Sequence, residues 1–398
     1  MSAAWLLLAA ALAAPGRVVV FPPAGPDRGA PGWIGAAVEE TLPRALQRVG
    51  VPALPGADRR RALEALGIIG PVATRATGVR VAEAFGARFV LFGSWDLGGG
   101  ELRLTLQPFD VAAAEQRPAL MARGPIEDLG RLVGALAHEL AGRPATAPGQ
   151  APPDVPFGAV RALGEGLAAR DRESRVTGLR RALTLDPGYP DATLALARAL
   201  YDAARFTEAR EVLLGLGSEP VFERERLFLD GACLLRLGRH AEADVVYAGL
   251  AQGEPTAGVL ANRAAARLRR PDAAGGASML LRQALEKAPH AAELAFGLGF
   301  AHFVEGDAEA AAFWLRDAVR YAPSDARARL ALSWALRGTA HADEADEQWR
   351  AATALDPSLE SQRRPDATRP MEPILPSETS LLLDPERRAA ARRALQPR

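Results

Sequence analysis

Residues 298–323 read LGFAHFVEGDAEAAAFWLRDAVRYAP, and this stretch decides the fold of most of the chain. Two helical patterns flank Glu305-Gly306-Asp307, which reads as the turn between them. Small residues, Gly299 and Ala311, stand at one phase of each helix, and the larger Leu315 follows. Antiparallel helices approach closely where side chains are small, while a large side chain fills the neighbouring hole. The stretch therefore predicts a helical hairpin.

The pattern of this hairpin recurs with a fixed period of 34 residues. Proline marks the register at Pro187, Pro255, Pro289, Pro323 and Pro357, with Val221 in the remaining place. The second helix repeats a small residue and then a larger one, at Ala209, Ala243, Ala277, Ala311 and Ala345 and at Leu213, Tyr247, Leu281, Leu315 and Trp349. The first helix repeats a small residue at Ala197, Gly231, Ala265, Gly299 and Ser333. Self-similarity at a fixed period predicts a stack of equal units.

This register resembles the tetratricopeptide repeat family, and it covers about six units from Asp154 to Pro357. The first unit departs from the pattern, because Arg175 stands where a small residue is expected. The resemblance implies an α-solenoid over residues 157–358, whose stacked hairpins leave a concave groove lined by the first helix of each pair.

The resemblance also assigns particular phases to that groove. In this sequence they hold Arg198, Tyr201, Phe228, Arg236, Asn262, Arg269, Arg270, Phe296, Phe300, Phe303, Arg327, Trp334 and Arg337. Aromatic and arginine side chains anchor many protein interfaces, and arginine pairs with carboxylates. We therefore expect a protein or peptide partner with some acidic character. The alternative is that the aromatic residues form core between repeats and the arginines only solvate the surface.

Residues 17–143 predict a separate α/β module. Val18 to Phe21 reads as a buried strand, a helix follows over residues 33–49, a short strand over 51–54, and helices around 59–66 and 74–85. Residues 88–95 and 101–107 predict a hairpin across Gly98-Gly99-Gly100, since the second segment alternates strictly and glycine accepts positive φ. A helix over residues 126–140 closes the module. The fold class is thus a small mixed α/β module followed by an all-α solenoid.

The order of these elements, with the motifs VVVFPP (18–23), GWIG (32–35) and FVLFGS (89–94), resembles the TolB amino-terminal-like domain of bacterial envelope proteins. That resemblance implies a sheet packed by helices that contacts other proteins and has no known catalytic residues. The propeller that follows this domain in TolB is absent from this sequence, so the resemblance does not carry over the same partners.

The remaining segments have the composition of a signal peptide, a linker and a carboxy-terminal tail. Residues 1–14 are apolar and end in small side chains, as a signal peptide does, although no basic residue precedes the run; cleavage and retention as an anchor both stay open. Residues 144–156 are a proline-rich linker. Residues 359–398 form a proline- and arginine-rich tail with a short helix after Pro385, which either caps the solenoid or is solvated.

Composition argues against several function classes. Acidic and basic residues number 48 each, so the sequence has no broad positive field for nucleic acid or anionic membranes. Cys233 is the single cysteine, so no disulfide forms within one chain. His138-Glu139 lacks the second histidine of a zinc-protease helix, and the other histidines are scattered over separate repeats. We therefore expect no catalytic, cofactor-binding or metal-ligating residues.

The interpretation is a non-catalytic, exported scaffold, located in the periplasm or peripheral to a membrane, which grips one protein in the repeat groove and contacts an envelope component through the first module. A regulatory or sensory module acting with a separate cyclase or kinase is the first alternative, and an enzyme using polar residues of the amino-terminal module is the second.

Overall fold

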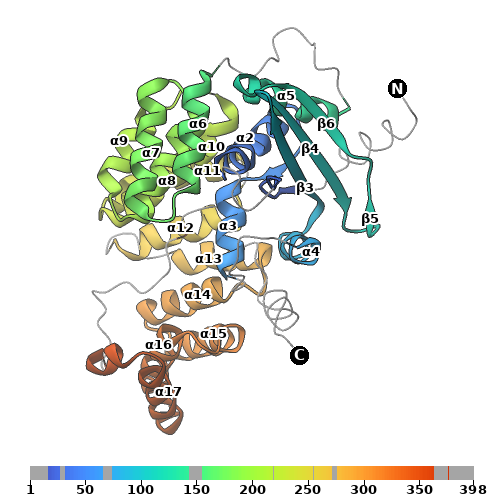
Figure 1. The fold of residues 1–398 in the computed structure, drawn as a ribbon. Helices are drawn as coiled ribbons and strands as arrows, with labels where there is room; N and C mark the ends of the chain where they lie inside the picture. The colour runs from blue at the N-terminus through green and yellow to red at the C-terminus, as the bar shows by residue number, and fades with distance from the viewer. Residues whose placement is uncertain are drawn as a thin grey trace. The chain divides into compact units, whose positions relative to one another are not determined.

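The computed structural model describes residues 17–26, 32–65, 74–142, 155–217, 219–253, 255–270, 276–362 and 375. The described residues form two compact units that divide between Arg226 and Leu227, within helix α10 (Pro220–Arg236). Unit 1 holds the sheet and the first helical hairpins, and unit 2 holds the later hairpins (Figure 1). This order confirms the predicted fold class of a small mixed sheet followed by consecutive helices.

The sheet of unit 1 is mixed. Its strands run in the order β2-β1-β3-β4-β5, and β6 also pairs with β4. β1 lies parallel to β2 and β3, whereas β4 is antiparallel to β3, β5 and β6. The strands are β1 (Arg17–Val20), β2 (Ala53–Leu54), β3 (Ala87–Gly98), β4 (Glu101–Asp110), β5 (Glu115–Gln116) and β6 (Leu120–Pro125). The last two were not predicted, because neither has the apolar alternation of β4.

The β3–β4 hairpin follows the sequence prediction closely. Gly98 pairs with Glu101, and the two turn residues between them, Gly99 and Gly100, have φ values of 62° and 85°. Such a two-residue turn with positive φ matches the twist of the strands it joins. Leu102, Leu104 and Leu106 of β4 are buried while their neighbours are more exposed, so the strand presents one apolar face.

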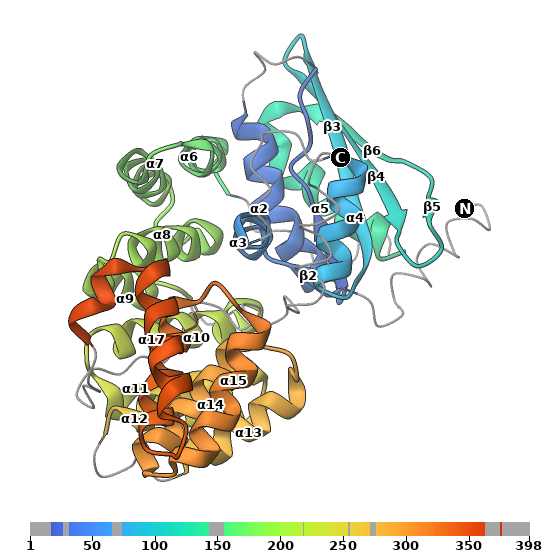
Figure 2. The same ribbon diagram turned by 90° about the horizontal axis from the view of Figure 1, so that it is seen from below.

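Three helices, α2, α4 and α5, pack around the sheet, and α3 packs on α2 and α4. Helix α2 contacts β1, β2 and α5, α4 contacts β3 and β1, and α5 contacts β6 (Figure 2). Gly78 of α4 lies so close to Phe92 and Val90 that a Cβ atom there would be 2.3 Å from the Phe92 ring. Their bounds are α2 (Trp33–Arg48), α3 (Gly56–Ala65), α4 (Arg75–Ala84) and α5 (Leu129–Leu140), with a 3-10 turn η1 (Ile126–Asp128) before α5.

Unit 1 also contains two hairpins of the helical region, α6 (Phe157–Ala168) with α7 (Arg172–Leu185) and α8 (Pro190–Asp202) with α9 (Phe206–Leu214). Helix α6 packs against α2: the rings of Trp33 and Phe157 are 6.0 Å apart, and a Cβ on Gly164 would lie 2.3 Å from the Trp33 carbonyl oxygen. The compact unit that holds the sheet thus extends over these two hairpins.

Unit 2 consists of helical hairpins. They are formed by α10 from Leu227 with α11 (His240–Gly253), α12 (Ala257–Leu268) with α13 (Ala277–Lys287), α14 (Ala292–Glu305) with α15 (Ala308–Tyr321), and α16 (Ala326–Arg337) with α17 (Ala342–Leu355). A 3-10 segment, η2 (Pro357–Gln362), follows and packs on α17.

The repeated small residues lie where the helices of each hairpin cross. A Cβ on Gly299 would be 2.6 Å from Leu315 Cγ, and a Cβ on Gly231 would be 2.7 Å from the Tyr247 ring. Ala243, Ala277 and Ala311 are fully buried. The predicted pairing of small with large residues is therefore confirmed, because these close approaches leave no space for a larger side chain.

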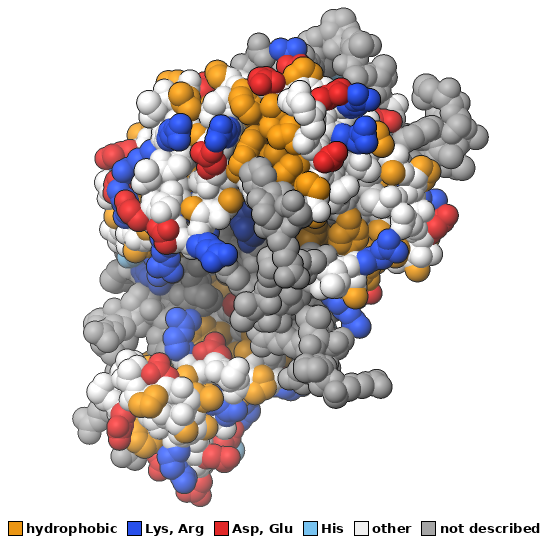
Figure 3. All heavy atoms as spheres, viewed as in Figure 1, with side chains coloured by type: hydrophobic (Ala, Val, Ile, Leu, Met, Phe, Trp, Pro, Cys, Tyr) orange, Lys and Arg blue, Asp and Glu red, His pale blue; other side chains and the backbone are white. Residues whose placement is uncertain are grey.

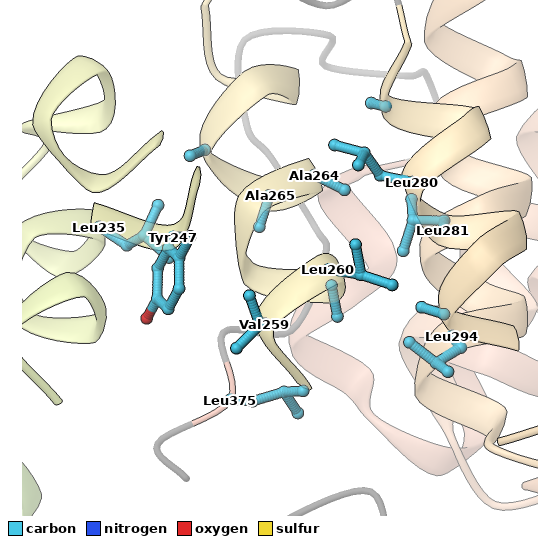
Figure 4. Packing of buried hydrophobic residues seen from close by; sticks show 14 of the residues in the cluster. Leu235, Tyr247, Val259, Leu260, Ala264, Ala265, Leu280, Leu281, Leu294 and Leu375 are labelled. Carbon is cyan, nitrogen blue, oxygen red and sulfur yellow. The ribbon is translucent and has the colours of Figure 1, made fainter. Parts of the chain in front are cut away.

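An apolar cluster links helices α10 to α14 of unit 2, and a second one joins α14 to α17. Leu260 and Ala264 of α12 pack toward Leu280 and Leu281 of α13, while Tyr247 lies on the other side of α12 (Figure 4). Cys233 is buried in its helix, as expected of a small apolar residue. Among the helices that the structure describes, none combines the length and apolarity needed to cross a bilayer. Residues 1–14, most of 144–156 and the helix expected after Pro385 lie outside the described residues.

Candidate functional site

The first helices of three successive hairpins, α12, α14 and α16, present the side chains that sequence phase assigned to a binding surface. We call this surface of unit 2 the inner-helix face. It comprises Asn262, Arg269, Arg270, Phe296, Phe300, Phe303, Arg327, Trp334 and Arg337. Helix α14 contacts both α12 and α16, so these side chains come from neighbouring elements.

An aromatic row runs along this face. The ring centroids of Phe296 and Phe300 are 6.3 Å apart, those of Phe300 and Phe303 6.3 Å, and those of Phe303 and Trp334 6.4 Å. The guanidinium of Arg327 stands 5.7 Å from the centroid of Phe296, within reach of a cation–π contact. The structure thus brings together five residues that the sequence proposed separately.

Much of the row is covered. Phe296, Phe300 and Trp334 are at most 3% exposed, and Phe303 is half-buried. The indole nitrogen of Trp334 donates to the carbonyl oxygen of Gln362 at 3.0 Å. Segment η2, which follows the last hairpin, contacts Trp334, while Phe296 packs in the core between α14, α15 and α16. The expectation that Phe296, Phe300 and Trp334 are open to a partner is therefore wrong for the structure as it stands, and only Phe303 of the row is partly exposed.

Asn262 is fully buried in α12 and is satisfied by three hydrogen bonds. Its Nδ2 donates to the Tyr247 hydroxyl and to the Leu375 carbonyl oxygen, both at 2.8 Å, and its Oδ1 accepts from the Leu375 N–H at 2.9 Å. Tyr247 in turn donates to the Phe228 carbonyl oxygen at 3.0 Å. Asn262 thus binds main-chain atoms of a residue that is distant in sequence.

The arginines of the inner-helix face differ in the ion pairs and hydrogen bonds that they make. Arg337 pairs with Asp346 at 2.6 Å, Arg270 lies 3.5 Å from Asp244, and Arg269 donates to the carbonyl oxygen of Ala265 at 3.0 Å. Arg327 is exposed. Figure 3 shows acidic and basic side chains interspersed over the visible part of the described surface, with no broad region of one sign.

Four predicted partner-binding residues lie elsewhere. Phe228 is 2% exposed and packs edge-on against Tyr247. It is therefore a core residue, and the prediction that it contacts a partner is wrong. Arg236 is exposed at the end of α10. Tyr201 is buried against Phe206, and Arg198 is buried in unit 1. For Tyr201 and Arg198 as well, direct contact with a partner is contradicted, because each is buried among residues of its own unit.

Arg198 belongs to a buried acid–base cluster between α2, α3, α8 and the first turns of α10. It contacts Glu40 at 3.0 Å and also pairs with Glu225. Arg60 lies 3.3 Å from Glu40, while Arg59 bonds Glu39 at 2.5 Å. Burial opposes ionisation of Glu40, but the guanidinium groups of Arg198, Arg60 and Arg44 outweigh it and lower the pKa of that carboxyl. The cluster ties the sheet region to the first helical hairpins.

A cavity of about 350 Å³ opens beside this cluster. It is lined by the arginines Arg60, Arg172, Arg175 and Arg198, by Asp202, and by Ala57, Leu167, Ala195 and Ala199. Sequence reasoning missed it, since its walls come from α3, α6, α7 and α8 together. No group of three His, Cys, Asp or Glu side chains within the described ranges is placed to hold a metal ion.

Comparisons with known proteins agree with the helical reading. A family model described as a tetratricopeptide repeat matches residues 179–220, which run from α7 through α8 and α9 to the start of α10. This segment is therefore a tetratricopeptide-type repeat, as the 34-residue register predicted. No curated protein sequence matches the chain significantly. The resemblance of residues 17–143 to the TolB domain stays a prediction.

Several solved structures are similar to the chain. PilF of Pseudomonas aeruginosa is 20% identical over 52% of this chain and 95% of its own, with a TM-score of 0.44. MamA of Desulfovibrio magneticus RS-1 is 18% identical over 42% and 95%, with a TM-score of 0.38. YrrB, described as a TPR protein with an unusual peptide-binding site, is 14% identical over 46% and 97%, with a TM-score of 0.36. Because these TM-scores lie below 0.5, we draw no functional conclusion from them.

Proposed function

We propose that the chain is an exported, non-catalytic scaffold that binds an extended segment of another protein along the inner-helix face. The observation that carries this proposal is the arrangement of Asn262 and the aromatic row on neighbouring first helices of stacked hairpins. Aromatic anchors beside a polar side chain that bonds main chain are features of a peptide-binding surface.

The contacts of the chain with itself support this reading. Trp334 bonds the main-chain carbonyl of Gln362, and Asn262 bonds both main-chain groups of Leu375. Each of these groove residues thus already binds polypeptide backbone. A surface that accepts backbone in this way is suited to an extended ligand whose side chains fall into adjacent apolar sites.

Export and an envelope partner are part of the proposal. They are supported by the apolar residues 1–14 and by the TolB-like order of elements in residues 17–143. The mixed sheet of β1 to β6 with α2, α4 and α5 around it has the form that this resemblance implies. We propose that this module contacts a second protein of the envelope.

The test is affinity capture from envelope fractions with the full chain carrying Arg327→Glu and Arg337→Glu. Both side chains are exposed on the inner-helix face, so their reversal leaves the core intact and removes one surface ion pair, that of Arg337 with Asp346. The matched control is Arg282→Glu, an exposed arginine of α13, the second helix of its hairpin. We expect proteins that the wild-type chain and the control capture to be depleted at least about tenfold with the double variant, since charge reversal at an interface costs more than about 1.4 kcal/mol.

Equal capture by all three chains would show that the face is not the partner site. Export is tested separately, by fractionating bacteria that express the full chain and comparing its mass with that of a chain lacking residues 1–14. Recovery only in the cytosol would contradict the exported location and leave the binding proposal standing.

A further inference from the structure

Leu375 is held against α12 by both of its main-chain polar groups. Its N–H donates to Asn262 Oδ1 at 2.9 Å and its carbonyl oxygen accepts from Asn262 Nδ2 at 2.8 Å, across 113 residues of sequence. A carboxamide carries one acceptor and one donor side by side, which is the arrangement that an extended residue offers to a neighbouring strand. Asn262 therefore recognises extended backbone whatever the side chain.

The orientation of the Asn262 amide is fixed by its surroundings. Both hydrogen bonds to Leu375 form only when Oδ1 points toward its N–H and Nδ2 points toward its carbonyl oxygen. The second proton of Nδ2 is then donated to the Tyr247 hydroxyl, at 2.8 Å. That hydroxyl is itself held by its bond to the Phe228 carbonyl oxygen. Buried polar groups that are fully bonded hold one geometry, so the site is preformed.

The side chain of Leu375 fills an apolar pocket formed by helices α12, α13 and α14. Leu375 is 5% exposed, and the cavity left beside it measures only about 10 Å³, roughly the space of one water molecule. Leu375 lines this small cavity together with Ala261, Ala265 and Leu268 of α12, Leu281 of α13, and Glu293, Leu294 and Gly297 of α14. Figure 4 shows Leu375 beside Val259 in this core. The fit selects a side chain of the size of leucine.

The sequence around Leu375 favours the extended backbone that this site binds. It reads Pro373-Ile374-Leu375-Pro376, and a residue that precedes proline is restricted to extended backbone. A second contact, from Trp334 to Gln362, holds the start of the same carboxy-terminal region on α16. Gln362 and Leu375 are thus each held by a first helix of the inner-helix face, α16 and α12 respectively.

We propose that Asn262 and the pocket beside it form a preformed site for an extended segment bearing leucine, and that the chain's own Leu375 occupies it, so that an external segment must displace Leu375 to bind. This inference names the ligand chemistry of the proposed scaffold face and rests on that function only for the identity of the external segment. Its test uses the chain's own sequence as the probe, so it succeeds or fails independently of partner capture.

The probe is a fluorescein-labelled peptide with the sequence of residues 369–379, RPMEPILPSET, titrated against the full chain and followed by anisotropy. In the chain carrying Leu375→Asp the site is vacated, because a carboxylate in an apolar pocket is strongly disfavoured. Short tethers give effective concentrations of the order of millimolar. We therefore expect the Leu375→Asp chain to bind the peptide at least about tenfold more tightly than wild type, where the tethered copy competes.

The controls separate the site from general effects. Leu382→Asp, a leucine of the same carboxy-terminal sequence, should leave the weak binding of wild type unchanged. A peptide in which the residue equivalent to Leu375 is aspartate should bind the Leu375→Asp chain at least about tenfold more weakly than the native peptide. Both peptides are measured on the same chain, so differences in folding between variants do not enter this comparison. Adding Asn262→Ala to the vacated chain should also abolish tight binding.

Equal peptide affinity of the wild-type and Leu375→Asp chains would overturn the internal occupant. Equal affinity of the native and aspartate peptides would overturn the leucine pocket. A direct readout is hydrogen exchange at the Leu375 amide, which should be slowed in wild type and fast after Asn262→Ala. Fast exchange in wild type would contradict the bond on which the inference stands.

Discussion

Replacing Arg198 by methionine is expected to destabilise unit 1 by about 2–4 kcal/mol. The Arg198 side chain is 8% exposed and Nη1 lies 3.0 Å from Oε1 of Glu40, whose side chain is 2% exposed. Unit charges 4 Å apart attract by about 4 kcal/mol at an effective dielectric constant of 20, and removing one partner of a buried pair costs about 3–5 kcal/mol. Arg60 remains 3.3 Å from Glu40 and retains part of the attraction, which lowers the expected loss.

The assay is hydrogen exchange of the full chain, read peptide by peptide by mass spectrometry, because it reports β1 and α2 separately from unit 2. Arg161→Met is the matched control: Arg161 pairs with Glu165 at 2.8 Å on α6, but the two side chains are 57% and 35% exposed, so the expected cost is below about 1 kcal/mol. Adding Glu40→Gln to Arg198→Met should recover part of the loss. If Arg198→Met opened β1 and α2 no more than Arg161→Met does, the buried pair would not be what joins these elements.

Three further outcomes follow from single buried contacts. Burial raises the pKa of Asp191 from 3.8 to about 6 despite the nearby Arg48 and Arg44; the folded state therefore holds its proton more tightly, and the stability of unit 1 should fall as pH rises from about 4 to about 6. Asp191→Asn should remove this dependence and raise the unfolding free energy above pH 6 by about 1–3 kcal/mol, measured by urea titration at pH 4 and pH 7.5; equal stabilisation at both values would contradict the shift. Tyr247→Phe should lower the unfolding free energy by about 1–3 kcal/mol, since it removes two buried hydrogen bonds of the hydroxyl group. Tyr321→Phe, at a more exposed site, should change the urea midpoint little. Similar midpoints for the two variants would show that the Tyr247 hydroxyl does not stabilise the fold. Gly299→Ala should lower the unfolding free energy by about 1–3 kcal/mol through overpacking, and with it the melting temperature, because the new Cβ would lie 2.6 Å from Leu315 Cγ. Gly249→Ala, with open space around it, should stabilise α11, and a stabilising Gly299→Ala would refute the close crossing.

The hairpins of unit 2 could be predicted because their packing is local. Gly231 and Tyr247, like Gly299 and Leu315, are separated by the same short interval and meet within one hairpin, so a steric rule repeated every 34 residues fixes the crossing. The first hairpin follows the same principle with different residues. Gly166 and Gly178 replace the expected small positions there, and a Cβ on Gly178 would lie 2.6 Å from the Gly166 Cα.

The association of the sheet region with the first hairpins could not be predicted in the same way. Arg198 and Glu40 lie 158 residues apart, and each also reads as an ordinary surface charge of its own helix. Gly164 was the available signal, since a glycine inside a helix suggests close approach, but nothing local identifies Trp33 as its neighbour. Contacts of this kind depend on tertiary arrangement, and helical periodicity does not carry that information.

The inner-helix face depends both on the local repeat pattern and on contacts between residues distant in sequence. The distant contacts change the ligand chemistry that we expect. Sequence phase placed Asn262 and the arginines on one surface, which led us to expect acidic partners. In the structure Arg337 and Arg270 face acidic side chains of their own unit, whereas Asn262 bonds backbone and the pocket beside it takes leucine. Recognition should then rest on main-chain bonds and apolar burial, which salt screens little. Peptide binding to the Leu375→Asp chain should accordingly change by less than about threefold between 50 and 500 mM NaCl, and a loss of tenfold or more would restore charge pairing as the main source of affinity.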